Sequence, residues 1–437
     1  MPSDIQKVPR RSFGEECLTL RKDRLPSSVP IIGLGCSSFS TFFWTPSELV
    51  EGDAQSDLWT PDNLDKSHPR VQEWIQTIHY AIEVCGINLL DTAPWYGHGT
   101  SEVVVGWALE DWLSKQEGDS VQREDLIINT KIGRYEADPR HQFDYSREKT
   151  LESVQTSLQR LKCQYIDVLQ LHDPEFAPSL TQLMTETIPT LLVCRNKGWC
   201  KALGMTGYPL EVQYQILQVT LDFFPPDKDG LSVWDQCLTY GHFNLHNTSL
   251  VSQPVFKIDK KEHSPPVSFA AFVRHCRMGL LAAAPLSMGL LAHSQPPAWH
   301  PASDELKEAC AQASKICEAQ SVDLATIAVV VALADARIPC TILGIKNRHE
   351  ANLAATIANR FHGVEVLESR SQDEILQQIL TQNEYKVWKT LSDPSEGPFA
   401  GVWKNGAYRW DGIKAARDFW RQMEGTTTDE WQWTWGK

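Results

Sequence analysis

Residues 87–102, INLLDTAPWYGHGTSE, join a short apolar run to the start of a helical pattern. The run ends on a carboxylate, Asp91, and a phenol, Tyr96, follows five residues later. Upstream, apolar residues recur at the spacing of one helix face: Val71, Trp74, Ile75, Ile78, Ile82 and Cys85. A strand without polar alternation is buried on both faces, so this strand between two helices predicts a βα unit of a parallel sheet.

The same unit recurs along the chain. Further apolar runs of strand length lie at 30–35, 126–132, 165–172, 201–207, 235–240, 279–285 and 340–345. Helical patterns separate the runs, near 70–85, 101–115, 146–162, 179–197, 209–219, 266–278, either 303–319 or 323–335, and 347–359. Eight strands that alternate with helices predict an α/β fold of the closed (β/α)8 TIM barrel type.

An open, doubly wound sheet is the alternative fold for this pattern. That fold predicts a dinucleotide fingerprint of three glycines after the first strand, followed by an acidic residue for the ribose. Residues 33–38, GLGCSS, supply two of the glycines and lack the third, and no acidic residue stands where the motif needs one. The closed barrel is therefore favoured.

The chain divides into three parts. Residues 1–29 form an N-terminal segment, 30–365 form the barrel, and 366–437 form a Trp-rich extension of helix and loop that we expect to pack on the barrel. Two long insertions follow the first and seventh strands, at 41–69 and 293–302. In a barrel both insertions lie at the carboxyl ends of the strands, where active sites of this fold are built.

Composition limits the partners of the protein. Its 437 residues carry a formal net charge of −14, which disfavours nucleic acid and anionic membranes because both require a basic surface. No apolar run is long enough to span a membrane, and the N-terminus lacks the apolar core of a signal peptide. We therefore expect a cytoplasmic protein, monomeric or a small homo-oligomer, that acts on a small molecule.

Cysteine and histidine spacing gives no sign of a metal site. The 11 cysteines contain no CxxC pair, and His141, His172, His242 and His246 show no metal-ligand spacing. Cysteines in this pattern are expected to be reduced and buried.

Ionisable residues stand at the ends of three successive predicted strands. Asp91, Lys131 and His172 each close a strand, and Tyr96 lies on the loop after the first. Each residue alone is explained by a turn, a helix cap or contact with solvent, but together on one barrel rim they predict an active site. The ordinary pKa of a tyrosine is about 10, and a neighbouring ammonium is expected to lower it.

Each of these residues has a role in moving a proton. The carboxylate keeps the ammonium charged in a partly dry site, and the imidazole holds a substrate oxygen beside the phenol. Such a set moves a proton on and off an alcohol or carbonyl oxygen. Side chains cannot carry the accompanying hydride, so a nicotinamide cofactor is implied.

At these residues the sequence resembles the aldo-keto reductases. The motifs DTAPWYG, NTKIG and LQLHD match the catalytic tetrad of that family, with Asp91, Tyr96, Lys131 and His172 in the corresponding order. The similarity extends from residue 31 to about residue 355. It implies a (β/α)8 barrel that binds a nicotinamide cofactor without a Rossmann domain.

The resemblance also implies the residues that bind the cofactor. Thr206 and Gly207, in the motif ALGMTG, correspond to the pair that holds the nicotinamide carboxamide, with Gly207 in place of the usual Asn. The segment ILGIKNRHEANLAA corresponds to the part that grips the adenosine phosphate. The remaining candidates are Gly35, Cys36 and Ser37 after the first strand, Pro285, Leu286, Met288 and Gly289 after the seventh, and Gly344, Lys346, Arg348, Glu350 and Asn352 after the eighth.

The forms MTGYPL, APLSMGLL and PPAWHPA are similar to the family branch that contains L-galactose dehydrogenase and D-arabinose 1-dehydrogenase. That branch implies oxidation of the C1 hydroxyl of a free aldose to a lactone, with NAD favoured over NADP. Aromatic rings stack on sugars, so the expected substrate residues are Trp44, Trp95, Trp299 and His300.

Two other functions stay open. One is an NADPH-dependent aldehyde or ketone reductase, because Lys346 and Arg348 are suited to pair with a 2′-phosphate. The other is a non-catalytic nicotinamide-binding regulatory subunit, against which the intact tetrad argues.

Overall fold

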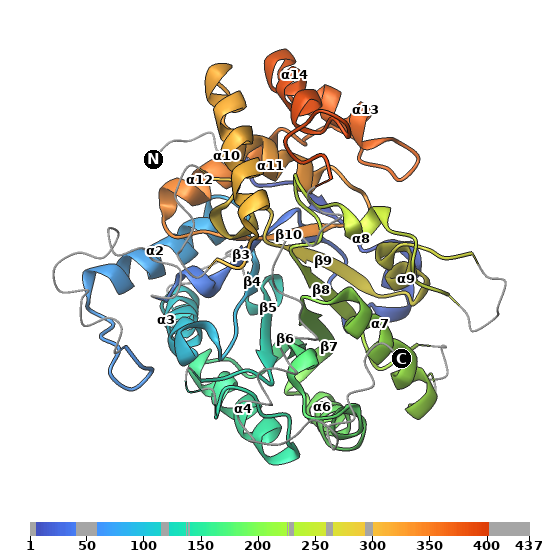
Figure 1. The fold of residues 1–437 in the computed structure, drawn as a ribbon. Coiled ribbons are helices and arrows are strands. Elements are labelled where there is room, and N and C mark those ends of the chain that lie inside the picture. Colours follow the sequence, from blue (N-terminus) through green and yellow to red (C-terminus); the bar gives the residue numbers. More distant parts are fainter. Residues whose placement is uncertain are drawn as a thin grey trace.

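A closed barrel of eight parallel strands forms the centre of the molecule, in the order β10-β3-β4-β5-β6-β7-β8-β9 (Figure 1). The structure is a computed structural model that describes residues 6–40, 59–114, 122–136, 138, 140–224, 226, 231–258, 265–292 and 300–401. The strands are β3 (Ile32–Gly35), β4 (Leu89–Asp91), β5 (Ile127–Ile132), β6 (Ile166–His172), β7 (Cys200–Gly207), β8 (Gln236–Tyr240), β9 (Gly279–Ala283) and β10 (Cys340–Gly344). All eight predicted strands are confirmed, and the alternative of an open sheet is excluded.

Helices surround the barrel on the outside (Figure 1). They are α2 (Pro69–Glu83), α3 (Thr100–Ser114), α4 (Arg147–Arg160), α5 (Leu180–Gln182), α6 (Ile188–Asn196), α7 (Leu210–Phe223), α8 (Ser249–Ser252), α9 (Phe269–His275), α10 (Asp304–Ala319), α11 (Leu324–Leu333) and α12 (Arg348–Asn359). The sequence left open which of two segments precedes the last strand. Both are helical, and α11, the second of them, contacts β10.

Alternation along the strands places the catalytic candidates inside the barrel. Leu89 and Ile127 belong to a small apolar cluster in the barrel interior. Successive side chains of a strand point to opposite faces of the sheet. Asp91 follows Leu89 on β4 by an even number of residues, as Lys131 follows Ile127 on β5, so both side chains point into the barrel. Both lie nearer the carboxyl ends of their strands, and His172 is the last residue of β6.

The N-terminal segment packs against the barrel. Strand β1 (Arg10–Arg11) pairs antiparallel with β2 (Val29–Pro30), and α1 (Glu15–Arg21) lies between them in sequence. Leu25 packs against Val168 of β6 and Ala202 of β7, two residues near the amino ends of their strands. Residues 6–30 therefore cover the end of the barrel opposite the catalytic candidates, which we call the barrel floor.

A buried ion cluster fixes the barrel floor. The Arg21 guanidinium pairs with Asp235, and both side chains are inaccessible to solvent. The Asp235 carboxylate also lies 3.2 Å from guanidinium nitrogens of Arg24 and Arg195 and accepts a hydrogen bond from the Leu203 amide (2.9 Å). This cluster joins the N-terminal segment to the loop before β8.

We expect Asp235→Asn to lower the free energy of unfolding by about 3–5 kcal/mol, because it leaves the buried Arg21 cation without a counter-charge. Urea denaturation measures this change. The half-exposed pair of Asp373 and Lys389 provides the control, since Asp373→Asn is expected to have little effect. Equal effects of the two substitutions would contradict the role given to Asp235.

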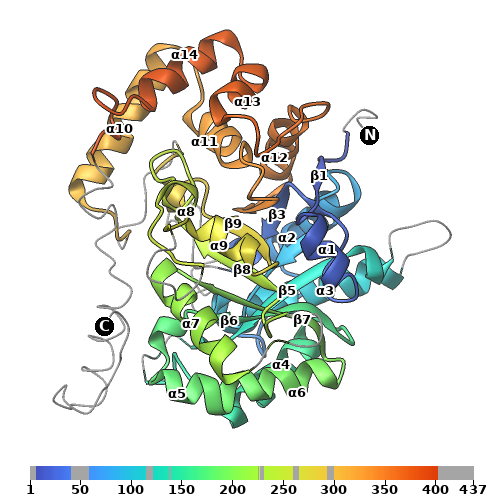
Figure 2. The same cartoon turned by 90° about the vertical axis from the view of Figure 1, so that its right-hand side faces the viewer.

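The extension beyond residue 365 begins with two helices, α13 (Gln372–Ile379) and α14 (Gln382–Leu391). They lie beside α10 and α11 in both views (Figures 1 and 2). Each starts with a capping box, at Ser371 and Thr381.

Over the described residues, no single helix is long and apolar enough to cross a membrane. Only α10 and α11 taken together pass that test, and they are bent by 108°.

Candidate active site

Lys131 lies at the centre of the tetrad. Its ammonium donates hydrogen bonds to Asp91 Oδ1 (2.5 Å), to the Thr92 carbonyl (2.8 Å) and to the Tyr96 hydroxyl oxygen (3.1 Å). An ammonium has three hydrogens and no acceptor, so all of its donors are used. The phenol oxygen is thus an acceptor toward Lys131, and its own hydrogen is available for a substrate oxygen.

The loop 97–99, GHG, brings Tyr96 into this position. Gly97 (φ 60°), His98 (φ 55°) and Gly99 (φ 103°) are left-handed in succession, a conformation that glycine adopts without strain. A Cβ at Gly97 would lie 2.0 Å from the Thr100 hydroxyl. The two glycines therefore permit this turn, and His98 Nδ1 lies 3.2 Å from the Tyr135 carbonyl.

His172 stands beside the phenol as a neutral imidazole. The two rings meet edge to face with centroids 6.3 Å apart. Burial is the main cause that lowers the pKa of His172 to about 3, although the neighbouring Asp173 carboxylate opposes it. A neutral imidazole can donate or accept a hydrogen bond at a substrate oxygen without charging.

The expected direction of the Tyr96 pKa shift is wrong. Burial raises the pKa of the phenol above its ordinary value, and the Lys131 ammonium only partly opposes this effect. The sequence shows the ammonium but not the loss of water around the phenol. Burial alone would lower the pKa of Lys131, but Asp91 and Tyr96 raise it above its ordinary value, so Lys131 stays charged.

Gln170 is a site residue that the sequence analysis missed. Its side-chain amide donates to Asp91 Oδ2 (2.9 Å), and the residue is fully buried on β6. Gly204 on the neighbouring β7 leaves room for it, because a Cβ there would lie 3.0 Å from Gln170 Cγ. Gln170 therefore fixes the Asp91 carboxylate with Oδ1 toward Lys131. A polar residue two positions before His172 was the available signal.

We expect Gln170→Leu to lower kcat by about tenfold with little change in KM, since it leaves one buried carboxylate oxygen of Asp91 without a partner. Steady-state kinetics measure both constants. Gln236→Leu is the matched control: Gln236 is buried on β8, and its side-chain nitrogen has no hydrogen-bond partner among the described residues. Equal losses in the two variants would show that Gln170 acts only through packing.

The cofactor residues expected after β7 and β9 lie at the carboxyl ends of these strands. Thr206 lies opposite His172 in the sheet register. Residues Pro285, Leu286, Met288 and Gly289 belong to a strained turn, in which Ala284, Ser287, Met288 and Gly289 all have positive φ. Strained backbone of this kind concentrates at ligand sites.

The neighbouring Glu175 explains why a glycine stands at position 207. A Cβ at this position would lie 3.0 Å from the Glu175 carboxyl, so Glu175 fills the space that the usual Asn would take. Burial raises the pKa of Glu175 well above its ordinary value, which favours a neutral carboxyl there.

The residues expected at the adenosine end surround the start of α12. Gly344 is exposed with open space beside it, and Lys346 and Arg348 bring two cations to the helix N-terminus. Glu350 accepts a hydrogen bond from the Lys346 amide (2.7 Å), and the Asn352 side-chain oxygen accepts one from Tyr80 (3.4 Å). A helix N-terminus with two cations fits a phosphate. Gly35, Cys36 and Ser37 lie at the end of β3, which pairs with β10.

The expected substrate residues have different surroundings. Trp95 is half-buried, with the Arg134 guanidinium 4.0 Å from its ring centroid. Both ring nitrogens of His300 contact backbone, Nε2 at the Ser287 carbonyl (3.0 Å) and Nδ1 at the Ala302 amide (3.1 Å). His300 thus holds the turn after β9, and this geometry does not support the predicted contact with substrate. Trp44 and Trp299 lie outside the described residues.

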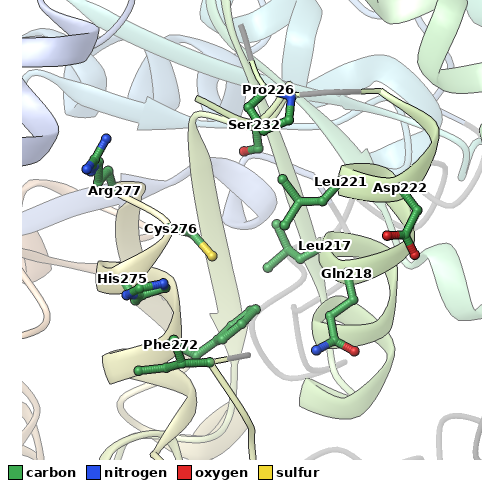
Figure 3. Close-up of a pocket in the computed structure, with 11 residues that line it drawn as sticks. Leu217, Gln218, Leu221, Asp222, Pro226, Ser232, Phe272, His275, Cys276 and Arg277 are labelled. Atoms are coloured by element: carbon green, nitrogen blue, oxygen red, sulfur yellow. The ribbon is translucent and has the colours of Figure 1, made fainter. Parts of the chain in front are cut away.

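A separate hollow of about 470 Å³ lies between α7 and α9 (Figure 3). Its lining includes Leu221 near the end of α7 and Phe272 and Arg277 on and after α9. In a barrel, helices end where the following strands begin, so this hollow is at the floor end and not beside the tetrad. Within the described ranges, no three His, Cys, Asp or Glu residues are grouped to hold a metal ion.

The sequence is similar to that of known proteins. The family model for the aldo/keto reductase family matches residues 59–361. The L-galactose dehydrogenase of Arabidopsis thaliana is 33% identical over 283 residues, which cover 64% of this chain and 77% of that protein. The D-arabinose 1-dehydrogenase of Saccharomyces cerevisiae is 31% identical over 274 residues, or 62% of this chain and 72% of that protein.

Solved structures agree on the fold. The holo form of aldo-keto reductase AKR11C1 from Bacillus halodurans superposes with a TM-score of 0.52 at 18% identity, covering 86% of this chain and 99% of that one. The glycerol dehydrogenase AKR11B4 from Gluconobacter oxydans has a TM-score of 0.51 at 19% identity, covering 87% and 97%.

Proposed function

The chain belongs to the aldo/keto reductase family, and from this premise we propose that it is an NAD(P)-dependent aldose 1-dehydrogenase. It would oxidise the C1 hydroxyl of a free aldose to the lactone. The observation that carries the proposal is the connected set of Asp91, Lys131, Tyr96 and His172 at one barrel rim. Two similar proteins are themselves named as dehydrogenases of sugars, which supports the substrate class.

The four residues would divide the work as follows. In oxidation, Tyr96 would act in its phenolate form, which the Lys131 ammonium stabilises. The phenolate oxygen would take the proton of the C1 hydroxyl. His172 would hold the same substrate oxygen by a hydrogen bond. Asp91 keeps Lys131 charged throughout. In reduction, Tyr96 returns the proton to the oxygen of the carbonyl.

A nicotinamide, when bound, would accept the hydride from C1 in oxidation and supply it in reduction. Thr206 fits its carboxamide, the strained turn after β9 fits the bridging phosphates, and Lys346 and Arg348 fit the adenosine end. Similarity to the sugar dehydrogenases favours NAD, whereas the two cations suit NADP. Turnover measured with each dinucleotide decides between them.

We expect opposite pH profiles for the two directions. Burial raises the pKa of Tyr96 above the ordinary value of a phenol, so Tyr96 keeps its proton through neutral pH. Reduction needs that proton and should stay constant up to about pH 9, whereas kcat/KM for oxidation should rise about tenfold per pH unit over the same range. His172, with a pKa of about 3, should add no inflection. An inflection near pH 6 to 7 that disappears in His172→Gln would contradict this assignment.

An NADPH-dependent aldehyde or ketone reductase is the second candidate. The observation that favours it is the pair of cations Lys346 and Arg348 at the start of α12, which suit the 2′-phosphate of NADPH. A panel of free aldoses with NAD and NADP, and of simple aldehydes with NADH and NADPH, separates the two by absorbance of the reduced cofactor. Strong NADPH-dependent reduction without any sugar oxidation would exclude the dehydrogenase.

A further inference from the structure

An ion pair lies beside His172 and Trp95, and none of the roles above uses it. Asp173 directly follows His172, and its carboxylate Oδ2 lies 2.7 Å from Arg134 Nη1 and 3.7 Å from His172 Nε2. Arg134 follows β5, and its guanidinium faces the Trp95 ring at 4.0 Å from the centroid. The pair therefore lies beside the imidazole that would hold the reacting oxygen.

The backbone holds Asp173 in an unusual conformation. Its φ of 46° and ψ of 53° are left-handed, which costs free energy for a residue other than glycine. The buried Tyr145 hydroxyl contacts the carbonyls of both His172 (2.8 Å) and Asp173 (2.6 Å), and the Asp173 amide donates to the Thr206 carbonyl (2.8 Å). Three contacts thus fix a strained residue next to the catalytic imidazole.

The pair is not needed to orient His172. A separation of 3.7 Å is too long for a hydrogen bond, so Asp173 does not set the ring by direct contact. The side chains of Asp173 and Arg134 stay 11% and 18% exposed, which leaves part of each open to a ligand. Within the described part of the chain, the only hydrogen bond of the Asp173 carboxylate is through Oδ2.

The chemistry of the pair suits a hydroxyl group. A carboxylate oxygen accepts the hydroxyl hydrogen, a guanidinium donates to the hydroxyl oxygen, and an aromatic ring such as Trp95 covers the carbon face of a sugar. A substrate without hydroxyl groups forms no hydrogen bonds with these donors and acceptors. Its binding would remove water from the ion pair without replacing the lost hydrogen bonds, which costs free energy.

We propose that the Asp173–Arg134 ion pair binds the hydroxyl on the carbon next to the reacting carbon and so selects aldoses and 2-hydroxyaldehydes over simple aldehydes. This inference rests on the proposed function, because it takes Tyr96 and His172 as the residues that hold the reacting oxygen. It adds a specificity role for two residues outside the tetrad.

The test compares reduction of glyceraldehyde, which has the neighbouring hydroxyl, with reduction of propanal, which lacks it. Asp173→Asn keeps the size of the side chain and is tolerated in the left-handed conformation. We expect it to lower kcat/KM for glyceraldehyde by about tenfold or more and for propanal by less than about twofold. The substitution removes the negative charge and one of the two acceptor oxygens, so the remaining amide oxygen cannot serve both Arg134 and a substrate hydroxyl, and only glyceraldehyde has that hydroxyl. Asp138→Asn is the matched control: Asp138 pairs with Arg140 on the same β5–α4 connection, and both substrates should be unaffected.

Arg134→Met provides a second variant, with the same selective loss expected. The wild-type protein gives an independent measurement, because oxidation of ribose should exceed that of 2-deoxyribose by about the factor that Asp173→Asn removes. Equal losses for glyceraldehyde and propanal, or no loss for either, would overturn the inference while leaving the proposed function intact. A wild-type protein that turns over no aldose and no aldehyde with either dinucleotide would instead refute the proposed function itself.

Discussion

Tyr96→Phe is expected to lower kcat about 1,000-fold or more in both directions while the protein remains folded. The substitution removes one oxygen, the atom that accepts a hydrogen bond from Lys131 and exchanges a proton with the substrate. No other described hydroxyl lies within hydrogen-bond distance of the Lys131 ammonium. Initial rates of NAD(P)H formation and consumption measure the loss.

Tyr165→Phe is the control for the removal of a phenol oxygen. Tyr165 precedes β6 at the floor end of the barrel, where its ring contacts Arg123 and Lys201. Its loss should leave kcat within about twofold, because it has no part in proton transfer. A Tyr96→Phe variant that retained near wild-type turnover of a free aldose would refute the mechanism, whereas binding of dinucleotide to that variant should persist.

Asp91→Asn is expected to act on both stability and activity. It leaves the buried Lys131 ammonium without its counter-charge, at a cost of about 3–5 kcal/mol in the free energy of unfolding. Because Asp91 is the main group that raises the pKa of Lys131, that pKa should fall, and kcat should drop about 100-fold or more as the charge beside Tyr96 is lost.

Asp167→Asn separates these two effects. Asp167 lies on β6 near the floor, where it pairs with Arg123 (2.9 Å) and Lys201 (3.2 Å) at a similarly low exposure. This variant should lose stability but keep its activity per folded molecule. Denaturation curves and kinetics on the same preparations measure both quantities, and an Asp91→Asn variant with full activity would contradict the assigned role.

The eight strands and the tetrad were predictable because both leave a local signal. A buried parallel strand is a continuous apolar run. Packing in an apolar core does not explain an ionisable residue at the end of such a run, so that residue stands out in the sequence. Lys131 and His172 could therefore be assigned to one rim from the order of residues along the chain. The left-handed turn after Tyr96 also leaves a local signal, because Gly97 and Gly99 flank a single residue.

The remaining features depend on contacts between distant parts of the chain. Arg21 and Asp235 pair across 214 residues, and no periodic pattern marks either of them. The same holds for Arg134, whose partners Asp173 and Trp95 follow other strands. The direction of the Tyr96 pKa shift follows from burial, which a sequence does not display. The contact of His300 with the Ser287 carbonyl depends on how the chain folds back after β9.

The closure of the barrel determines when the protein can complete its fold. β3 is the first of the eight barrel strands along the chain, yet one of its two neighbours is β10, which begins at Cys340. The ion cluster of the barrel floor likewise cannot form until Asp235 is synthesised. Until β10 is synthesised, the facing edges of β3 and β9 are unpaired, so the ring cannot close before all eight strands are present. Such dependence on contacts between distant residues makes folding slow and exposes the growing chain to aggregation.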